Sequence, residues 1–207
     1  MITELRNPLT QTLITKLRDT KTDAFTFRHT INELTKQLVY EALQNFPTTK
    51  QEIKTWKGKR QYKTIEQSNI VVATVLRAGM PMLESTMELL PEISAGFLAI
   101  KRDEVTHKSK LYFDRMPECK GKTILLVDPM LATGGSMIDA IEIIKTKKPS
   151  KIIVLNIIGS PQGLEILQNR YKNIDIFIAK IDKKLNLDKY IIPGIGDAGD
   201  RAYNTPE

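Results

Sequence analysis

The chain has 207 residues, of which 41% are hydrophobic, and its formal net charge at pH 7 is +7. This length suits one domain with a complete core, so we expect a single domain over residues 1–207. No apolar stretch reaches the roughly 18 to 20 residues that cross a bilayer, and the N-terminus lacks a signal-peptide pattern, which excludes a membrane-spanning protein and favours a cytoplasmic one.

The first part of the chain is predicted to be helical. From Phe27 onward, apolar residues recur at helical spacing as far as Ala42, and the helix should end before Pro47. We expect this helix to pack on the core or against another subunit. His29 lies on it and is expected to be structural.

A basic segment with aromatic residues follows this helix. It contains one acid, Glu52, and six cations: Lys50, Lys54, Lys57, Lys59, Arg60 and Lys63. Such a segment can bind RNA. It can equally form a solvated hairpin whose inward-facing residues are Ile53, Trp56, Tyr62 and Ile65, and we favour the hairpin. Its charge would also help to steer a polyanionic substrate.

From residue 70 onward, apolar runs alternate with amphipathic segments. Strands are predicted at 70–76, 94–100, 123–128, 152–158 and 174–179, and helices at 82–90, 136–148 and 163–171. This alternation predicts an α/β fold with a parallel sheet and helices on both faces. The segment after Lys184 is rich in glycine, and we expect an irregular binding loop there.

A polar stretch with a few aromatic residues interrupts this pattern between Lys101 and Lys120. A long polar excursion between buried strands is often a lid or a flexible hairpin. Cys119 lies between charged neighbours and has no partner for an internal disulfide, so we expect a reduced thiol at the surface. His107 is expected to be solvated in an exposed loop.

The loop after the strand at 123–128 has the properties of a phosphate site. Residues from Thr133 to Ser136 precede a predicted helix, whose free backbone N–H groups point at an anion, and glycines let a phosphate approach closely. No lysine follows Gly135, so this is not the loop of a nucleoside triphosphatase. A serine-capped turn is the simpler alternative. Asp128, at the strand's carboxyl end, can accept hydrogen bonds from sugar hydroxyls and favours a ribose phosphate.

Three motifs together resemble the type I phosphoribosyltransferases, in the form characteristic of the uracil phosphoribosyltransferases. Asp128 to Ser136 resembles the family's phosphoribosyl-diphosphate loop, Val75 to Met80 its pyrophosphate loop, and Tyr190 to Asp200 its uracil-binding segment. They occur in the family's order and spacing, and the resemblance covers nearly the whole chain. It implies the type I fold, with a flexible hairpin near Arg102 and a C-terminal base-binding loop.

The resemblance also implies a reaction, in which uracil and phosphoribosyl diphosphate give UMP and pyrophosphate. The implied catalytic residues are Arg77, Arg102, Asp128 and Asp197. The implied donor-binding residues are Arg77, Arg102, Asp128, Pro129, Met130, Leu131, Ala132, Thr133, Gly134, Gly135, Ser136 and Asp197. The implied uracil-binding residues are Ile191, Gly196, Asp197 and Ala198.

Cofactors and partners follow from the same resemblance. We expect Mg²⁺ to bridge substrate oxygens, without a dedicated set of protein ligands. We also expect a homo-oligomer, a dimer or larger, and GTP is raised as an activator. His107 to Lys110 depart from the commoner family form, which leaves the hairpin's shape open. The alternative function is a pyrimidine-sensing RNA-binding regulator on the same fold. The basic segment supports it, but the C-terminal motif favours the enzyme.

Overall fold

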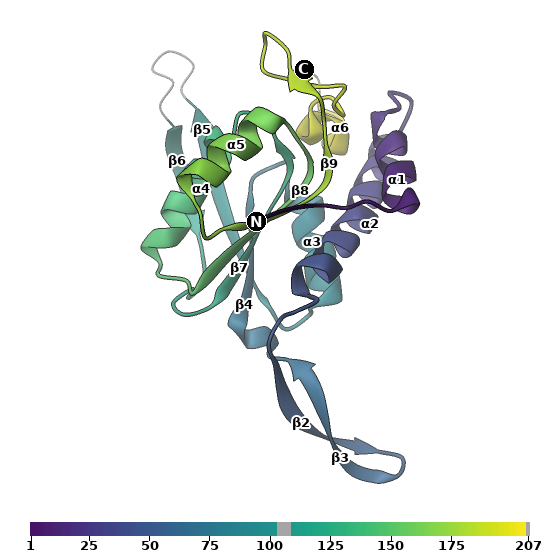
Figure 1. Ribbon diagram of the computed structural model, residues 1–207, viewed down its shortest axis with the longest axis vertical. Helices are drawn as coiled ribbons and strands as arrows, with labels where there is room; N and C mark the ends of the chain where they lie inside the picture. The colour runs from purple at the N-terminus through teal and green to yellow at the C-terminus, as the bar shows by residue number, and fades with distance from the viewer. Residues whose placement is uncertain (103–108, 206–207) are drawn as a thin grey trace.

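The computed structural model describes residues 1–102 and 109–205, and a central β-sheet organises them (Figure 1). Seven strands form this sheet in the order β1-β9-β8-β7-β4-β5-β6. Neighbouring strands are parallel except β5 and β6, which are antiparallel. The strands are β1 (Ile2–Glu4), β4 (Ile70–Val75), β5 (Ser94–Arg102), β6 (Ser109–Arg115), β7 (Thr123–Leu131), β8 (Lys151–Gly159) and β9 (Asp175–Ile181).

Helices cover both faces of the sheet, as predicted (Figure 1). One face packs against α1 (Pro8–Arg18), α2 (Ala24–Leu43), α3 (Met80–Leu89) and α6 (Ala198–Tyr203). The other packs against α4 (Gly135–Thr146) and α5 (Pro161–Arg170). Because both faces are covered, every residue of β4 is buried. No helix in the described part of the chain is long and apolar enough to cross a membrane.

The predicted strands and helices from residue 70 onward are confirmed, with ends that shift by a few residues. The structure adds β1, whose three residues pair with β9 at the sheet edge, and a 3₁₀ turn at Gln67–Asn69. The long N-terminal helix, α2, begins at Ala24, earlier than predicted. Its start is fixed by Asp23, whose side chain accepts a hydrogen bond from the backbone N of Thr26 at 2.8 Å.

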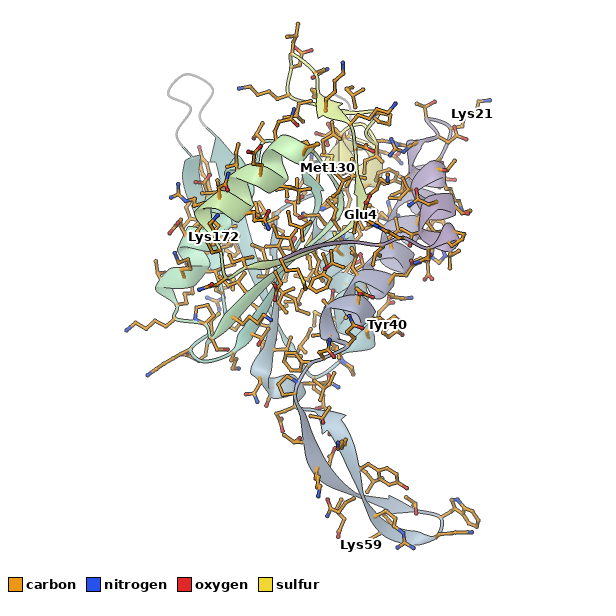
Figure 2. All side chains as sticks on the ribbon, in the orientation of Figure 1. Glu4, Lys21, Tyr40, Lys59, Met130 and Lys172 are labelled. Carbon is orange, nitrogen blue, oxygen red and sulfur yellow. The ribbon has the colours of Figure 1, made fainter. Side chains whose placement is uncertain are left out.

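The basic segment forms an antiparallel hairpin that projects away from the sheet (Figure 1), and we call it the arm. It consists of β2 (Thr48–Thr55) and β3 (Gly58–Ile65), and Lys59 lies near its tip (Figure 2). The hairpin was predicted, but most of its inward-facing residues were wrong. Trp56 is 89% exposed and Tyr62 48%, because neither face of this two-stranded ribbon is covered. Ile65 alone of the predicted inward-facing residues packs against the core.

Two further expectations are corrected. Cys119 is buried, since its side chain packs in the core beneath α4 and donates a hydrogen bond from Sγ to the backbone O of Pro117. The C-terminal segment is not irregular: it contains β10 (Lys184–Leu185), β11 (Ile191–Ile192) and α6. Gly194 and Gly196 occupy the turns before α6 with positive φ, whereas Gly199 lies within α6.

Candidate active site

The loop between β7 and α4 has the predicted form of a strand that leads into a helix N-terminus. β7 continues past Asp128 to Leu131, and α4 starts at Gly135. Gly134 has a φ of +81°, and a Cβ there would lie 3.3 Å from the backbone O of Gly163. Only glycine adopts this turn without strain. The first backbone N–H groups of α4 are therefore free to face an anion.

The start of α5 supports this loop from behind. Ser160 donates a hydrogen bond from Oγ to the backbone O of Ala132 at 2.6 Å, and accepts one from the backbone N of Gly163 at 2.9 Å. A Cβ on Gly163 would lie 2.3 Å from the backbone O of Ala132. The phosphate-type loop thus rests directly on the backbone of α5.

A cavity of about 300 Å³ opens in front of this loop. It brings two of the predicted motifs together, because Arg77 and Ala78 from the end of β4 face the loop across it. Most predicted donor-binding residues line it: Arg77, Asp128, Met130, Leu131, Ala132, Thr133, Gly134, Gly135 and Ser136. Pro129 is buried and is not among the lining residues.

Asp128 lies partly buried in this cavity, on the strand next to β8. Its Oδ1 accepts a hydrogen bond from the backbone N of Met130 at 2.9 Å, and its backbone O accepts one from Nδ2 of Asn156 at 2.7 Å. Burial is the main cause that raises the pKa of Asp128 to about 7; the hydrogen bond from Met130 opposes the rise and the negative charge of Asp197 adds to it. The two predicted acids are therefore close enough for their charges to interact, although Asp128 lines this cavity and Asp197 lines the neighbouring one.

Arg77 lies two residues after the end of β4 and joins the pyrophosphate-type motif to the C-terminal segment. The Leu76–Arg77 peptide bond is cis. The Arg77 side chain is 57% exposed and donates a hydrogen bond from Nη2 to Oδ1 of Asp200 at 3.0 Å. Asp200 is a site residue that sequence reasoning did not assign a role, although it ends the third motif. A positively charged group is thus held at the cavity mouth.

The C-terminal segment forms a second cavity, of about 450 Å³, beside the first. Met130 and Ala132 line both, and Figure 2 places Met130 below the C-terminal segment. Of the predicted base-binding residues, Ile191, Gly196 and Asp197 line the second cavity, while Ala198 is buried at the start of α6. Asp197 caps α6, since its Oδ1 accepts a hydrogen bond from the backbone N of Asp200 at 2.9 Å. The turn thus borders a cavity with both apolar and charged lining residues.

Comparison with known proteins identifies the family. The family model named uracil phosphoribosyltransferase matches residues 4–205. The chain belongs to the uracil phosphoribosyltransferase family. It is therefore a phosphoribosyltransferase enzyme, and the predicted resemblance is confirmed. Among its relatives, the uracil phosphoribosyltransferase of Aquifex aeolicus is 40% identical over 98% of both chains. That of Dictyoglomus turgidum is 41% identical over 99% of this chain and all of the relative.

Solved structures agree with this family. A protein from Aquifex aeolicus has a TM-score of 0.94 and 40% identity, over 98% of both chains. A purine phosphoribosyltransferase from Pyrococcus horikoshii has a TM-score of 0.50 and 15% identity, over 74% of this chain and 87% of the other. The second likeness shows the fold alone, and that fold is the type I phosphoribosyltransferase fold.

The predicted hairpin of this uracil phosphoribosyltransferase family member is described only at its base. Arg102 is the last residue of β5 and Ser109 the first of β6, and these strands pair antiparallel. The side chain of Arg102 lies outside the described residues, as do His107 and Lys108. Their predicted contacts stay predictions.

Sequence reasoning gave no role to several residues that line the second cavity, which we call the base-side cavity, among them Tyr190, Ile158 and Lys189. Tyr190 opens the third motif, so its position in the motif could have indicated it. Ile158 lies in β8, where every residue after the first is buried. Its sequence signal is that of an ordinary core residue, and only the three-dimensional structure places it at the cavity.

Proposed function

We propose that the chain transfers the phosphoribosyl group of phosphoribosyl diphosphate to N1 of uracil, giving UMP and pyrophosphate in pyrimidine salvage. The observation that carries the proposal is the pair of cavities that share Met130 and Ala132, one bordered by the phosphate-type loop and the other by the glycine-rich turn. An assay with radiolabelled uracil tests it directly: UMP should form only when the diphosphate donor is present.

Each part of the donor has a matching group in the first cavity. The backbone N–H groups from Leu131 to Ser136, with the hydroxyls of Thr133 and Ser136, would hold the 5′-phosphate. Asp128 would accept hydrogen bonds from the ribose hydroxyls. Arg77 at the cavity mouth and Arg102 on β5 would neutralise the diphosphate. This assignment uses each charged or hydroxyl-bearing side chain among the predicted donor-binding residues that line the cavity.

The reaction needs few side chains that exchange protons. The bond from the anomeric carbon to pyrophosphate breaks while uracil N1 approaches from the opposite face, so positive charge develops on the sugar. Positioning and electrostatic stabilisation supply most of the rate under such conditions. Arg77 and Arg102 would stabilise the departing pyrophosphate, and hydrogen bonding with solvent would suffice to remove the uracil proton.

Two carboxylates whose charges interact, Asp128 and Asp197, fit a divalent cation. One oxygen of Asp128 and one of Asp197 accept backbone hydrogen bonds, which leaves the other oxygen of each available. Burial first, and the charge of Asp197 second, raise the pKa of Asp128, and a nearby cation would favour its ionised form against both effects. Mg²⁺ held through donor oxygens near Asp128 and Asp197 would supply charge neutralisation to the diphosphate.

Uracil carries no charge, so its recognition depends on hydrogen bonds and an apolar face. The backbone of Gly196 and Ala198, together with Ile191, borders the base-side cavity or its edge. Positive φ at Gly196 turns the peptide groups of this segment away from a regular helix or strand. We propose that these groups pair with one edge of the uracil ring, while Asp197 adjoins the ribose.

Replacing Arg77 with alanine should lower kcat by about a hundredfold, because loss of one charge at the developing pyrophosphate costs roughly 3 kcal/mol. The KM for uracil should change little, since the base binds in the neighbouring cavity. Steady-state assays measure both. Asp200→Asn is the matched control: it removes the ion pair with Arg77 but keeps the guanidinium, and its kcat should stay near that of the wild type. An Arg77→Ala enzyme with an unchanged kcat would place the diphosphate elsewhere.

The kcat/KM for the donor should fall as the pH drops below about 7, because protonated Asp128 loses an acceptor for the ribose hydroxyls. The pH profile of Asp128→Asn provides the control, since ionisation of the donor itself affects both enzymes equally. Parallel pH profiles of kcat/KM in the two enzymes would refute this role of Asp128.

In the absence of substrates, the raised pKa of Asp128 should make the folded enzyme less stable as the pH rises. Relative to Asp128→Asn, the free energy of unfolding should decrease from about pH 4 to about pH 7 and then level off, as measured by denaturant titration.

The arm supports the further proposal that the enzyme is a homo-oligomer. A two-stranded hairpin is only marginally stable in water by itself, and this one exposes Trp56, Tyr62 and Ile53. A second subunit that covers these side chains would remove them from water. Sedimentation of the wild type beside Trp56→Lys would show whether the arm contributes to assembly.

GTP activation and the cytoplasmic location complete the proposal. GTP as an activator rests on the family resemblance alone, and UMP formation with and without GTP tests it. A cytoplasmic location is supported by the chemistry, since the donor and UMP are highly charged and do not cross bilayers unaided.

The RNA-binding alternative has only the charge of the arm in its favour. A gel shift with pyrimidine leader RNA would test it.

A further inference from the structure

Three arginines connect the N-terminal helices to the C-terminal segment that borders the base-side cavity. They are Arg18 at the end of α1, Arg28 in α2 and Arg201 in α6. We propose that Arg201 is a positioning residue for the base: it fixes the backbone beside Gly196 before uracil binds, and so determines uracil affinity. This inference rests on the proposed function.

Arg201 binds the end of α1 and the base-side turn with one guanidinium group. Its Nη1 donates to the backbone O of Leu17 and, at 2.7 Å, to that of Ile195. Its Nη2 donates to the backbone O of Asp19 at 2.7 Å. The carbonyls of Leu17 and Asp19 are at the C-terminus of α1, where the helix supplies no partners of its own. A planar group with several donors suits this arrangement of carbonyls.

The rest of the Arg201 side chain is held equally closely. Its guanidinium carbon lies 4.4 Å from the centre of the Phe27 ring, and Phe27 is fully buried. A Cβ on Gly196 would lie 3.2 Å from Cδ of Arg201, so the side chain packs against the backbone of that glycine. Gly196 is a predicted base contact, and Ile195 precedes it. Arg201 therefore touches the turn at the residues that face the base-side cavity.

The other two arginines hold the flanks of the same segment. Arg28 donates from Nη1 to the backbone O of Ala202 at 2.5 Å. Arg18 pairs with Asp182 at 2.5 Å, and Asp182 accepts a hydrogen bond from the backbone N of Gly194 at 2.9 Å. Because the segment is anchored on both sides, its backbone groups are ordered before a ligand binds. The entropy cost of ordering them therefore does not reduce the affinity for the base. Arg201 is the member of the set that contacts the turn between these anchors.

The test compares Arg201→Met with Arg170→Met in assays of UMP formation. Methionine keeps much of the apolar stem of arginine but removes all its donors. The KM for uracil should rise about tenfold, as expected when charged hydrogen bonds to the turn are lost, while the KM for the donor stays within about twofold. The ratio of kcat/KM for uracil to that for cytosine should fall, because a loose turn discriminates less. Arg170 is a matched control, since it too lies in the last turn of a helix beside an aromatic ring, that of Tyr171, but on α5. Its variant should behave like the wild type.

A merely structural role predicts a different pattern, in which the melting temperature and the active fraction fall but both KM values are unchanged. That pattern, or a wild-type uracil KM in folded Arg201→Met, would overturn the proposal. If Arg201→Met does not fold, the same comparison of KM values is made with Arg201→Gln, which keeps an amide donor. If neither variant folds, the role of Arg201 is structural and the proposal is also overturned. A wild-type enzyme that forms no UMP would instead refute the proposed function.

Discussion

Cytosine should be a poor substrate, with a kcat/KM about 10⁴-fold below that of uracil. It presents an amino donor where uracil has an oxygen, and a bare ring nitrogen where uracil has a donor. A site made of backbone groups near Gly196 and Ala198 cannot exchange donors for acceptors by changing a rotamer. The mismatch would leave buried polar groups unpaired, and sites that hydrogen-bond a substrate reject such analogues by roughly this factor.

Competition assays at equal donor concentration would measure this ratio. Small 5-substituted uracils, such as the 5-fluoro analogue, are the positive control, since they keep the hydrogen-bonding edge of uracil. Orotate should fail, because its carboxylate adds a negative charge to a cavity lined by Asp188 and Asp197 against one lysine, Lys189. Comparable kcat/KM values for uracil and cytosine would refute the C-terminal site.

Donor binding should collapse in Gly135→Val. Gly135 begins α4 and lines the cavity, so a branched side chain there would occupy the space in which a phosphate approaches the helix N-terminus. Losing two charged hydrogen bonds would cost about 4 kcal/mol, or roughly a thousandfold in affinity for phosphoribosyl diphosphate. The first turn of a helix tolerates valine, so the fold should persist.

Titration calorimetry with the donor measures the loss, and thermal unfolding confirms that the variant is folded. Gln11→Val is a suitable control because Gln11 is an exposed residue near the start of another helix, α1. It should bind the donor as the wild type does. Wild-type affinity in folded Gly135→Val would mean that the phosphate does not bind at this loop.

The sequence predicted the strands and helices whose pattern of apolar residues is explained by burial of one or both faces. The apolar run of β7 indicates a strand covered on both faces, and the helical spacing of Met137, Ala140, Ile141 and Ile144 marks the buried side of α4. The phosphate-type loop could be placed because its glycines and hydroxyls follow that strand directly.

The parts that could not be predicted depend on contacts between distant segments. Cys119 has charged neighbours in sequence, yet its own side chain packs beneath α4. The pairing of Arg77 with Asp200 joins residues 123 positions apart. α6 forms among glycines because Asp197 caps it and because Arg28 and Arg201 tie it to the N-terminal helices. The order of residues within one segment does not indicate which distant segment it will contact.

The support of the phosphate-type loop by α5 has a consequence for substitutions outside the loop. Ser160 and Gly163 lie more than twenty residues from the loop in sequence, but they touch the backbone of Ala132. A Cβ at position 163 would lie 2.3 Å from the backbone O of Ala132, whereas one at position 134 would lie 3.3 Å from the backbone O of Gly163 and is also opposed by the positive φ. Substitutions at Ser160 or Gly163 are therefore expected to disturb the phosphate-type loop, although this second stretch of the chain contains none of the three motifs.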